Sequence, residues 1–140
     1  LSYAQTFKPA AMVDCATLTG AVVISLGRHA AAVMSNDEAL TEELRAAGDR
    51  SDERCWPLPL WPEYAKQLES ETADLMNVGG REGGSITAAC FLEAFVGETP
   101  WAHLDIAGTA YGDGKLPYQR KGGYGFPVRL LVDWVRSRAR

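Results

Sequence analysis

The sequence lacks any apolar run long enough to cross a membrane, and it has few side chains of the kinds that usually bind zinc. The longest apolar candidate, residues 21–26, is far shorter than the roughly 20 residues that span a bilayer. Residues 1–10 lack the basic start and apolar stretch of a secretory signal. The 2 His and 3 Cys match no zinc motif in their spacing. We therefore expect a cytoplasmic protein with no membrane span.

The sequence has three cysteines, Cys15, Cys55 and Cys90, which lie far apart. Because their number is odd, they cannot all pair with one another. In a reducing compartment such residues are usually small buried hydrophobes. We expect them to be free thiols.

Excess positive charge is also missing. The 14 basic and 18 acidic residues give a formal charge of −4. A general nucleic-acid binder usually carries a basic face, so a nucleic-acid partner is not favoured. At 46% hydrophobic and 23% charged residues, the 140 residues are typical of one soluble globular domain.

The pattern of apolar and turn residues predicts strands that alternate with helices. Such an order is typical of an α/β fold, a three-layer αβα sandwich with helices on both faces of the sheet. Strands are predicted at residues 11–16, 29–34 and 102–108, with a weaker candidate at 73–77, and an extended segment at 56–59. Helices are predicted at residues 2–7, 21–26, 37–47 and 86–96, and from Pro62 and Pro127 onward.

Several side chains have specific predicted roles in these helices. Gly48 is expected to end the helix that Asn36 or Asp37 begins, and Ser85 to be the N-cap of the helix over residues 86–96. The side chains expected to face the core are Leu40, Leu44 and Ala47 on one helix, Trp61, Ala65 and Leu68 on the next, and Leu131, Trp134 and Val135 on the last.

Three groups of residues are weak candidates for chemistry. The glycine-rich residues 79–84 resemble an anion cradle, but they lack the signature of a phosphate loop, and a tight turn is the favoured interpretation. His103 and Asp105, with His29 and Asp14, could form a metal site, but hydrogen-bonded structural roles are favoured. Cys15 and Ser25 have no nucleophile motif around them. Residues 111–126 are long for a plain connection, which indicates a functional or interface loop.

Ligands in α/β folds bind beyond the carboxyl ends of strands. Two such ends, residues 16–20 and 106–108, are rich in small residues that let a ligand approach the backbone. Taken with residues 73–80 and 83–89, the segments 13–21 (VDCATLTGA) and 101–109 (WAHLDIAGT) resemble the leucyl aminopeptidase family. The likeness extends over essentially all 140 residues and corresponds to the C-terminal portion of that family's catalytic domain, which has a mixed sheet.

The resemblance implies a parent enzyme that releases N-terminal amino acids, often leucine, from peptides. Two divalent ions, Mn or Zn, would activate the attacking water, and the parent would be a cytoplasmic homohexamer. The family's ligands are a lysine and carboxylates, some of them in a motif NTDAEGRL that this sequence lacks and that would precede Leu1. We therefore expect no catalytic residue and no metal ligand in this chain, no ion bound to it, and no activity when it is alone.

The same resemblance implies that this chain supplies one side of the substrate site. We expect Asp14, His103 and Asp105 to be structural. A plain strand-end turn is the alternative for residues 107–110. The substrate-binding residues implied are Thr17, Leu18, Thr19, Gly20, Ala107, Gly108 and Ala110.

Two other functions remain open from the sequence alone. One is a non-enzymatic binding or assembly module, for DNA or for oligomerisation. The other is a nucleotide-binding domain that uses residues 79–85.

Overall fold

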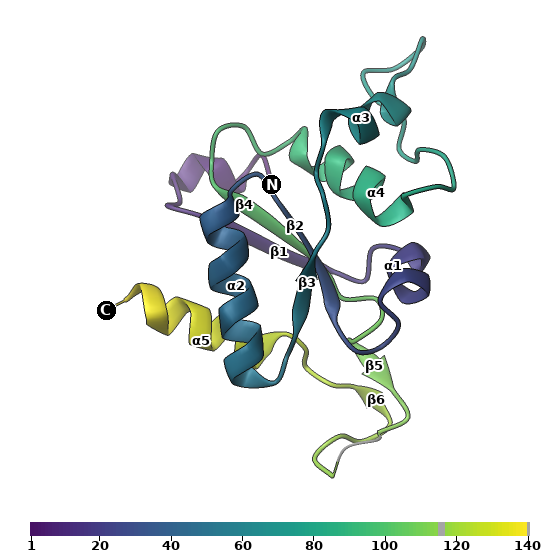
Figure 1. Cartoon of the computed structure of the whole chain (residues 1–140). Coiled ribbons are helices and arrows are strands. Elements are labelled where there is room, and N and C mark those ends of the chain that lie inside the picture. The colour runs from purple at the N-terminus through teal and green to yellow at the C-terminus, as the bar shows by residue number, and fades with distance from the viewer. Residues whose placement is uncertain (115–116, 140) are drawn as a thin grey trace.

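The computed structural model describes residues 1–114 and 117–139, so part of the loop predicted at 111–126 lies outside the described residues. A central sheet has the strand order β1-β4-β2-β3 (Figure 1). Its strands are β1 (Met12–Ala16), β2 (Ala31–Ser35), β3 (Cys55–Pro57) and β4 (Trp101–Asp105). β1 runs parallel to β4, β4 antiparallel to β2, and β2 parallel to β3. The sheet is mixed, as the resemblance implied.

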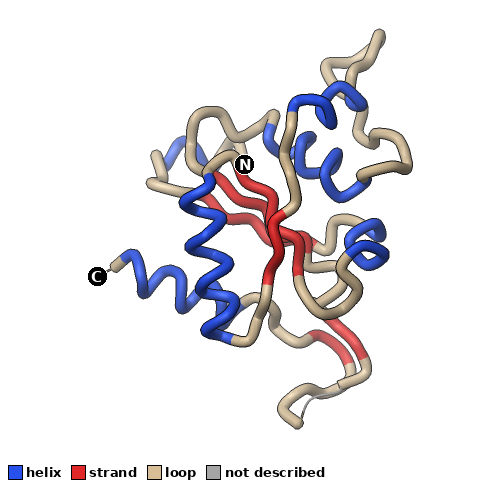
Figure 2. Tube along the Cα trace, in the orientation of Figure 1, coloured by secondary structure: helices blue, strands red, loops and turns tan. Residues whose placement is uncertain are grey.

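Helices cover both faces of this sheet, which confirms the three-layer prediction (Figure 2). On one face lie α2 (Glu38–Ser51) and α5 (Val128–Arg138). The other face carries α1 (Gly20–Ser25) and α4 (Gly84–Glu93), and α4 packs against α3 (Pro62–Ala65) and the 3-10 turn Lys66–Leu68. A short 3-10 helix, Ala4–Phe7, precedes β1, and a small hairpin of β5 (Tyr111–Gly112) and β6 (Gly122–Gly123) projects from the body.

The side chains of β2 show why both faces need a cover. Successive residues of a strand point to opposite faces. Ala31 and Val33 accordingly pack with α2 and α5, whereas Ala32 and Met34 pack with α1 and α4. Each core contains one buried tryptophan, Trp134 on the α2/α5 face and Trp101 on the α1/α4 face. A strand buried on both faces explains the continuous apolar run in the sequence.

A buried carboxylate joins the end of α2 to the start of α5. The Leu130 backbone N–H donates to Glu53 Oε2 at 2.9 Å, and Arg129 Nε donates to Glu53 Oε1 at 3.1 Å. The first N–H groups of a helix have no partner within the helix, so Glu53 satisfies one of them. This contact sets the position of α5 on the sheet.

Two predicted helix signals are wrong for local reasons. Gly48 lies inside α2, which continues to Ser51, and a Cβ there would lie 2.8 Å from the Glu53 carbonyl oxygen. The glycine therefore permits a close approach and does not end the helix. Ser85 is not an N-cap, because α4 begins at Gly84 with Gly83 as its cap, and α4 ends at Glu93 instead of Val96.

Three predicted buried positions are also wrong. Trp61 is 60% exposed and Ala65 is exposed, because α3 is a single turn, whereas Leu68 is buried. Val135 is 56% exposed. The inward side chains of α5 are Leu130 and Trp134, with Leu131 packed at the edge of the core.

Strand boundaries differ from prediction as well. Residues 73–77 form bends and no strand. β2 begins at Ala31, two residues later than predicted, and β4 ends at Asp105, after which the chain turns. Among the described helices, none is long and apolar enough to cross a membrane.

Candidate functional site

The carboxyl ends of β1 and β4 lie next to each other. Ala16 and Asp105, the last residues of these parallel strands, are register partners. The Ile106 N–H donates to the Ala16 carbonyl oxygen at 2.9 Å, which extends the pairing by one step. The two segments that follow, residues 17–20 and 107–110, therefore start side by side. We refer to these two segments together as the strand-end surface.

The buried side chain of Asp105 connects both segments. Its Oδ1 accepts hydrogen bonds from the backbone N–H groups of Leu18 at 3.2 Å, Thr19 at 3.5 Å and Ala107 at 3.2 Å. Its Oδ2 accepts from the Thr19 hydroxyl at 2.6 Å. A buried carboxylate is tolerated when charge-assisted hydrogen bonds replace water in this way.

Thr19 extends the network to both helices on this face. As the N-cap of α1, its Oγ1 accepts from the Val22 N–H at 3.2 Å. Ser85 Oγ of α4 lies 3.0 Å from Thr19 Oγ1. Because a carboxylate only accepts, Thr19 donates its proton to Asp105, and Ser85 donates to Thr19. The N-terminal turns of α1 and α4 are thus joined through Asp105.

The segment of residues 17–20 is open on its other side. Thr17, Leu18 and Gly20 are exposed. A Cβ at Gly20 would meet no atom within 4 Å. Among the described residues, no hydrogen bond reaches the carbonyl oxygens of Thr17 and Leu18. This face therefore presents main-chain polar groups next to empty space.

Residues 107–110 form a tight turn. The N–H groups of Thr109 and Ala110 both donate to the Ile106 carbonyl oxygen, at 3.0 and 2.9 Å. Gly108 is buried, and a Cβ there would overlap the Gly27 carbonyl oxygen. Ala107 and Ala110 are partly buried. The structure thus brings the seven residues predicted to bind substrate onto two adjacent turns, while their role in binding stays a prediction.

The other residues considered for metal binding are Asp14 and His103, which form a pair on the sheet, and His29. His103 is fully buried, with Nδ1 2.6 Å from Asp14 Oδ1, and the Trp101 indole N–H donates to Asp14 Oδ2 at 2.7 Å. His29 is exposed, outside the strands. Within residues 1–114 and 117–139, no group of three or more His, Cys, Asp and Glu side chains could hold a metal ion.

The cysteine thiols are poor nucleophiles. Burial, with a smaller contribution from the Asp14 carboxylate, raises the pKa of the Cys15 thiol to about 11. Burial, with a smaller contribution from Asp49, raises the pKa of Cys55 to about 12. Because the thiolate is the reactive form, both are inert near neutral pH. All three cysteines are free thiols.

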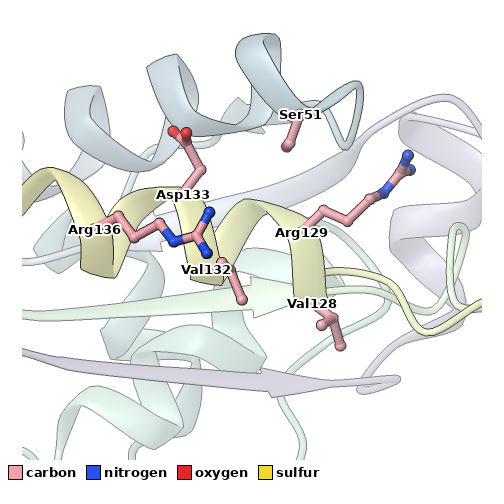
Figure 3. A pocket seen from close by; sticks show the side chains of 6 residues that line it. All are labelled: Ser51, Val128, Arg129, Val132, Asp133 and Arg136. Atoms are coloured by element: carbon pink, nitrogen blue, oxygen red, sulfur yellow. The ribbon is translucent and has the colours of Figure 1, made fainter.

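Two hollows lie away from the open face of residues 17–20. A shallow hollow of about 320 Å³ runs between α5 and the end of α2, lined by Val128, Val132 and the charged side chains of Arg129, Asp133 and Arg136 (Figure 3). None of the predicted substrate residues lines it. A larger cavity of about 950 Å³ lies beside the β5–β6 hairpin, and of the predicted residues only Gly108 lines it.

The glycine-rich segment before α4 is a turn that lets helices approach each other. A Cβ at Gly84 would lie 3.2 Å from the Ala21 Cβ, and Gly83 has a φ of 63°. Both features support the turn interpretation favoured from the sequence. The Ser85 hydroxyl, which a nucleotide cradle would use, points instead to Thr19.

The position of the strand-end surface defines the class of this protein. It is an α/β domain whose candidate ligand site lies beyond the carboxyl ends of two parallel strands. A family model described as the catalytic domain of the cytosol aminopeptidase family matches residues 1–132. The chain belongs to the cytosol aminopeptidase family.

Individual relatives agree with this assignment. The chain is 54% identical over 138 residues to a probable cytosol aminopeptidase of Geobacter sp. (strain M21), covering 99% of the chain and 28% of that relative. It is 55% identical over 137 residues to one of Geotalea uraniireducens, with 98% of the chain and 28% of the relative covered. A solved structure of a tomato leucine aminopeptidase mutant superposes with a TM-score of 0.89 at 38% identity, covering 96% of this chain and 26% of that one. The chain thus spans little more than a quarter of these relatives.

Proposed function

We propose that this chain forms the peptide-holding part of a leucyl aminopeptidase that removes N-terminal residues from peptides. The observation that carries the proposal is the strand-end surface, where open main-chain groups of residues 17–20 lie next to the small side chains of Ala107 and Ala110. An extended peptide binds through fixed main-chain donors and acceptors, and an apolar first side chain needs a concave lining free of water. Small residues leave room for that side chain.

The chemistry of the reaction needs groups that the described residues do not supply. Metal ions in such hydrolases, Mn or Zn, activate water and polarise the scissile carbonyl. The donor set here does not fit a pair of ions, because no cluster of ligating side chains exists within residues 1–114 and 117–139. We therefore propose that the ions bind in the part of the relatives that this chain does not span, and that the chain alone does not hydrolyse peptides.

An activity assay with two proteins tests this proposal. The first is the 140-residue chain, and the second is a chimera in which the chain replaces the matching 28% of the Geobacter sp. relative. We expect the chimera to hydrolyse a leucine anilide with added Mn²⁺ or Zn²⁺, and the chain alone to be inert. A folded chimera without activity contradicts the aminopeptidase function. Turnover by the chain alone at the chimera's rate contradicts its inertness.

We also propose, from the resemblance, that the full-length protein is a cytoplasmic homohexamer whose partners are peptide substrates. Loops such as residues 79–84 and 111–126 are then candidates for subunit contacts. Analytical ultracentrifugation of the chimera measures the assembly directly, and a monomer would contradict this part of the proposal.

A further inference from the structure

Asp105 is a buried carboxylate at the end of β4. It forms no ion pair among the described residues, and its negative charge is compensated by backbone N–H groups and one hydroxyl. These donors come from both segments of the strand-end surface, Leu18 and Thr19 on one side and Ala107 on the other. A single side chain thus determines the spacing of two segments that are 87 positions apart in the sequence.

The same hydrogen bonds set the direction of the main-chain groups. In a planar trans peptide the N–H and the preceding C=O point in opposite directions. Because the N–H groups of Leu18 and Thr19 point at Asp105, the carbonyl oxygens of Thr17 and Leu18 point away from it. These are the two carbonyls to which no described hydrogen bond is made, at the exposed face of residues 17–20.

The second segment, residues 107–110, also depends on Asp105 for its orientation. The Ala107 N–H donates to Asp105, so the peptide plane between Ile106 and Ala107 is fixed. The Ile106 carbonyl of this plane then accepts both N–H groups that close the turn over residues 107–110. The orientation of that turn, and with it the place of Ala110, follows from the Asp105 contact.

We propose that Asp105 is a positioning residue of the substrate site. Its carboxylate, acting with Thr19, orients the open carbonyls of residues 17 and 18 toward a bound peptide. It also holds the turn of residues 107–110 at a fixed distance from these carbonyls. This inference rests on the proposed aminopeptidase function. We call the contacts of Asp105 with Leu18, Thr19 and Ala107 the Asp105 clamp.

A matched control exists on the opposite side of the fold. Glu53 is also a buried carboxylate that accepts from one backbone N–H and one side chain, but its partners are Leu130 and Arg129. Its loss weakens the attachment of α5 without touching residues 17–20. Glu53→Gln therefore measures what general loosening does to peptide hydrolysis.

The first measurement is hydrogen exchange on the 140-residue chain by NMR. Asp105→Asn keeps the shape but removes the charge, and hydrogen bonds to a charged acceptor are roughly twice as strong as neutral ones. We expect the amides of Leu18, Thr19 and Ala107 to exchange at least about tenfold faster, while those of β2 stay protected. Unchanged exchange at these three amides overturns the clamp.

The second measurement separates positioning from structure in the chimera described above. Asp105→Asn and Thr19→Val are expected to raise KM for a leucyl peptide roughly tenfold or more while kcat changes about twofold or less, because misplaced binding groups weaken substrate binding. Thr19→Ser, which keeps the hydroxyl, is expected to have the KM of the parent chimera. Glu53→Gln lowers the unfolding midpoint and leaves the KM unchanged.

The outcomes distinguish the two proposals. An active chimera whose KM is indifferent to Asp105→Asn overturns the positioning role and leaves the aminopeptidase function standing. An equal rise in KM with Glu53→Gln also overturns it, because general loosening then explains the effect. An inactive, folded parent chimera overturns the aminopeptidase function, and with it the role of the clamp in catalysis.

Discussion

Asp14 and His103 are register partners on adjacent parallel strands, and the Asp14 Oδ1 lies 2.6 Å from the His103 Nδ1. The other carboxylate oxygen accepts the indole N–H of Trp101 at 2.7 Å. His103 is fully buried, and within the part of the chain that the structure describes its Nε2 has no hydrogen-bond partner. Asp14 is therefore what satisfies two buried ring nitrogens on this face of the sheet.

Removing that carboxylate should destabilise the fold. Asp14→Ala leaves the Trp101 indole N–H and the His103 Nδ1 without their acceptor, and an unsatisfied buried polar group costs about 1–3 kcal/mol. Because two groups lose their acceptor, we expect a loss of free energy of unfolding of at least about 1–3 kcal/mol, measured by urea denaturation. Asp14→Asn, which retains one acceptor oxygen, should lose less. An unchanged unfolding midpoint in Asp14→Ala would contradict the role assigned to this side chain.

Removing the buried carboxylate of Glu53 should lower the free energy of unfolding more than removing the exposed carboxylate of Asp133. Glu53→Ala removes the acceptor of the Leu130 N–H and should lower the free energy of unfolding by about 1–3 kcal/mol. Asp133→Ala removes the exposed pair with Arg50, and such pairs contribute at most about 1 kcal/mol. Parallel thermal melts of the two variants test the difference. Equal losses would show that the Glu53 bond does not attach α5.

Two glycines on the strand-end surface should respond to substitution in opposite ways. Gly20→Val places a Cβ where no atom lies within 4 Å, at an exposed residue, so we expect little change in stability. In the chimera it should raise KM for a leucyl peptide about tenfold or more, because the methyl groups occupy space next to the open carbonyls. Activity assays and melts of the same preparation check both parts.

Gly108→Ala is the contrasting variant. Its Cβ would overlap the Gly27 carbonyl oxygen, which is backbone and cannot move aside freely. Overpacking of this kind typically costs about 1–3 kcal/mol. We expect a lower melting temperature for the isolated chain. A variant as stable as the parent would contradict the close approach of Gly108 to the Gly27 carbonyl.

The raised cysteine pKa values predict a loss of stability at alkaline pH. Cys55 has a pKa of about 12 in the folded chain against 9.0 for a free thiol. A raised folded pKa gives a contribution that is complete below pH 9 and declines as the pH rises toward 12, because the unfolded thiol ionises first. Between pH 8 and pH 10 the decline for Cys55 is on the order of 1 kcal/mol.

Cys55→Ala separates this effect from the titration of lysines and tyrosines. Urea denaturation at pH 8 and pH 10 gives the stability difference between parent and variant at each pH. We expect the advantage of the parent to shrink by roughly 1 kcal/mol. A difference that is constant with pH would show that the Cys55 thiol is accessible to ionisation in the folded chain.

The layers of the fold were predictable from the sequence because they depend on local patterns. Asp37 caps α2 as expected, its carboxylate accepting from the Leu40 N–H at 2.7 Å, and Leu40, Leu44 and Ala47 are buried. The apolar runs of β1, β2 and β4 reflect burial under helices on both faces. The location of the candidate site followed from strand ends rich in small residues, together with the family resemblance.

The errors arise where distant residues decide the local structure. Gly48 looks like a helix end, but its role is to let the Glu53 backbone approach α2. The apolar pattern predicts that Val135 faces the core, but the buried side chains of α5 are Trp134 and Leu130, whose N–H donates to Glu53 from 77 positions away. Ser85 meets Thr19 across 66 positions, and no local pattern predicts that contact. The sequence predicts that Asp105 lies within the last strand, but it predicts neither that the strand ends there nor the hydrogen bonds by which Asp105 connects both segments.

The separation of the two cores gives the molecule a built-in optical probe on each side of its sheet. Trp101 and Trp134 are buried in different layers, whereas Trp56 and Trp61 are largely in solvent. With the other three indoles replaced by phenylalanine, emission from Trp101 would follow melting of the layer that carries the candidate site. In a second variant that keeps only Trp134, emission would follow the opposite layer, so the two halves of the sandwich could be monitored separately as they unfold.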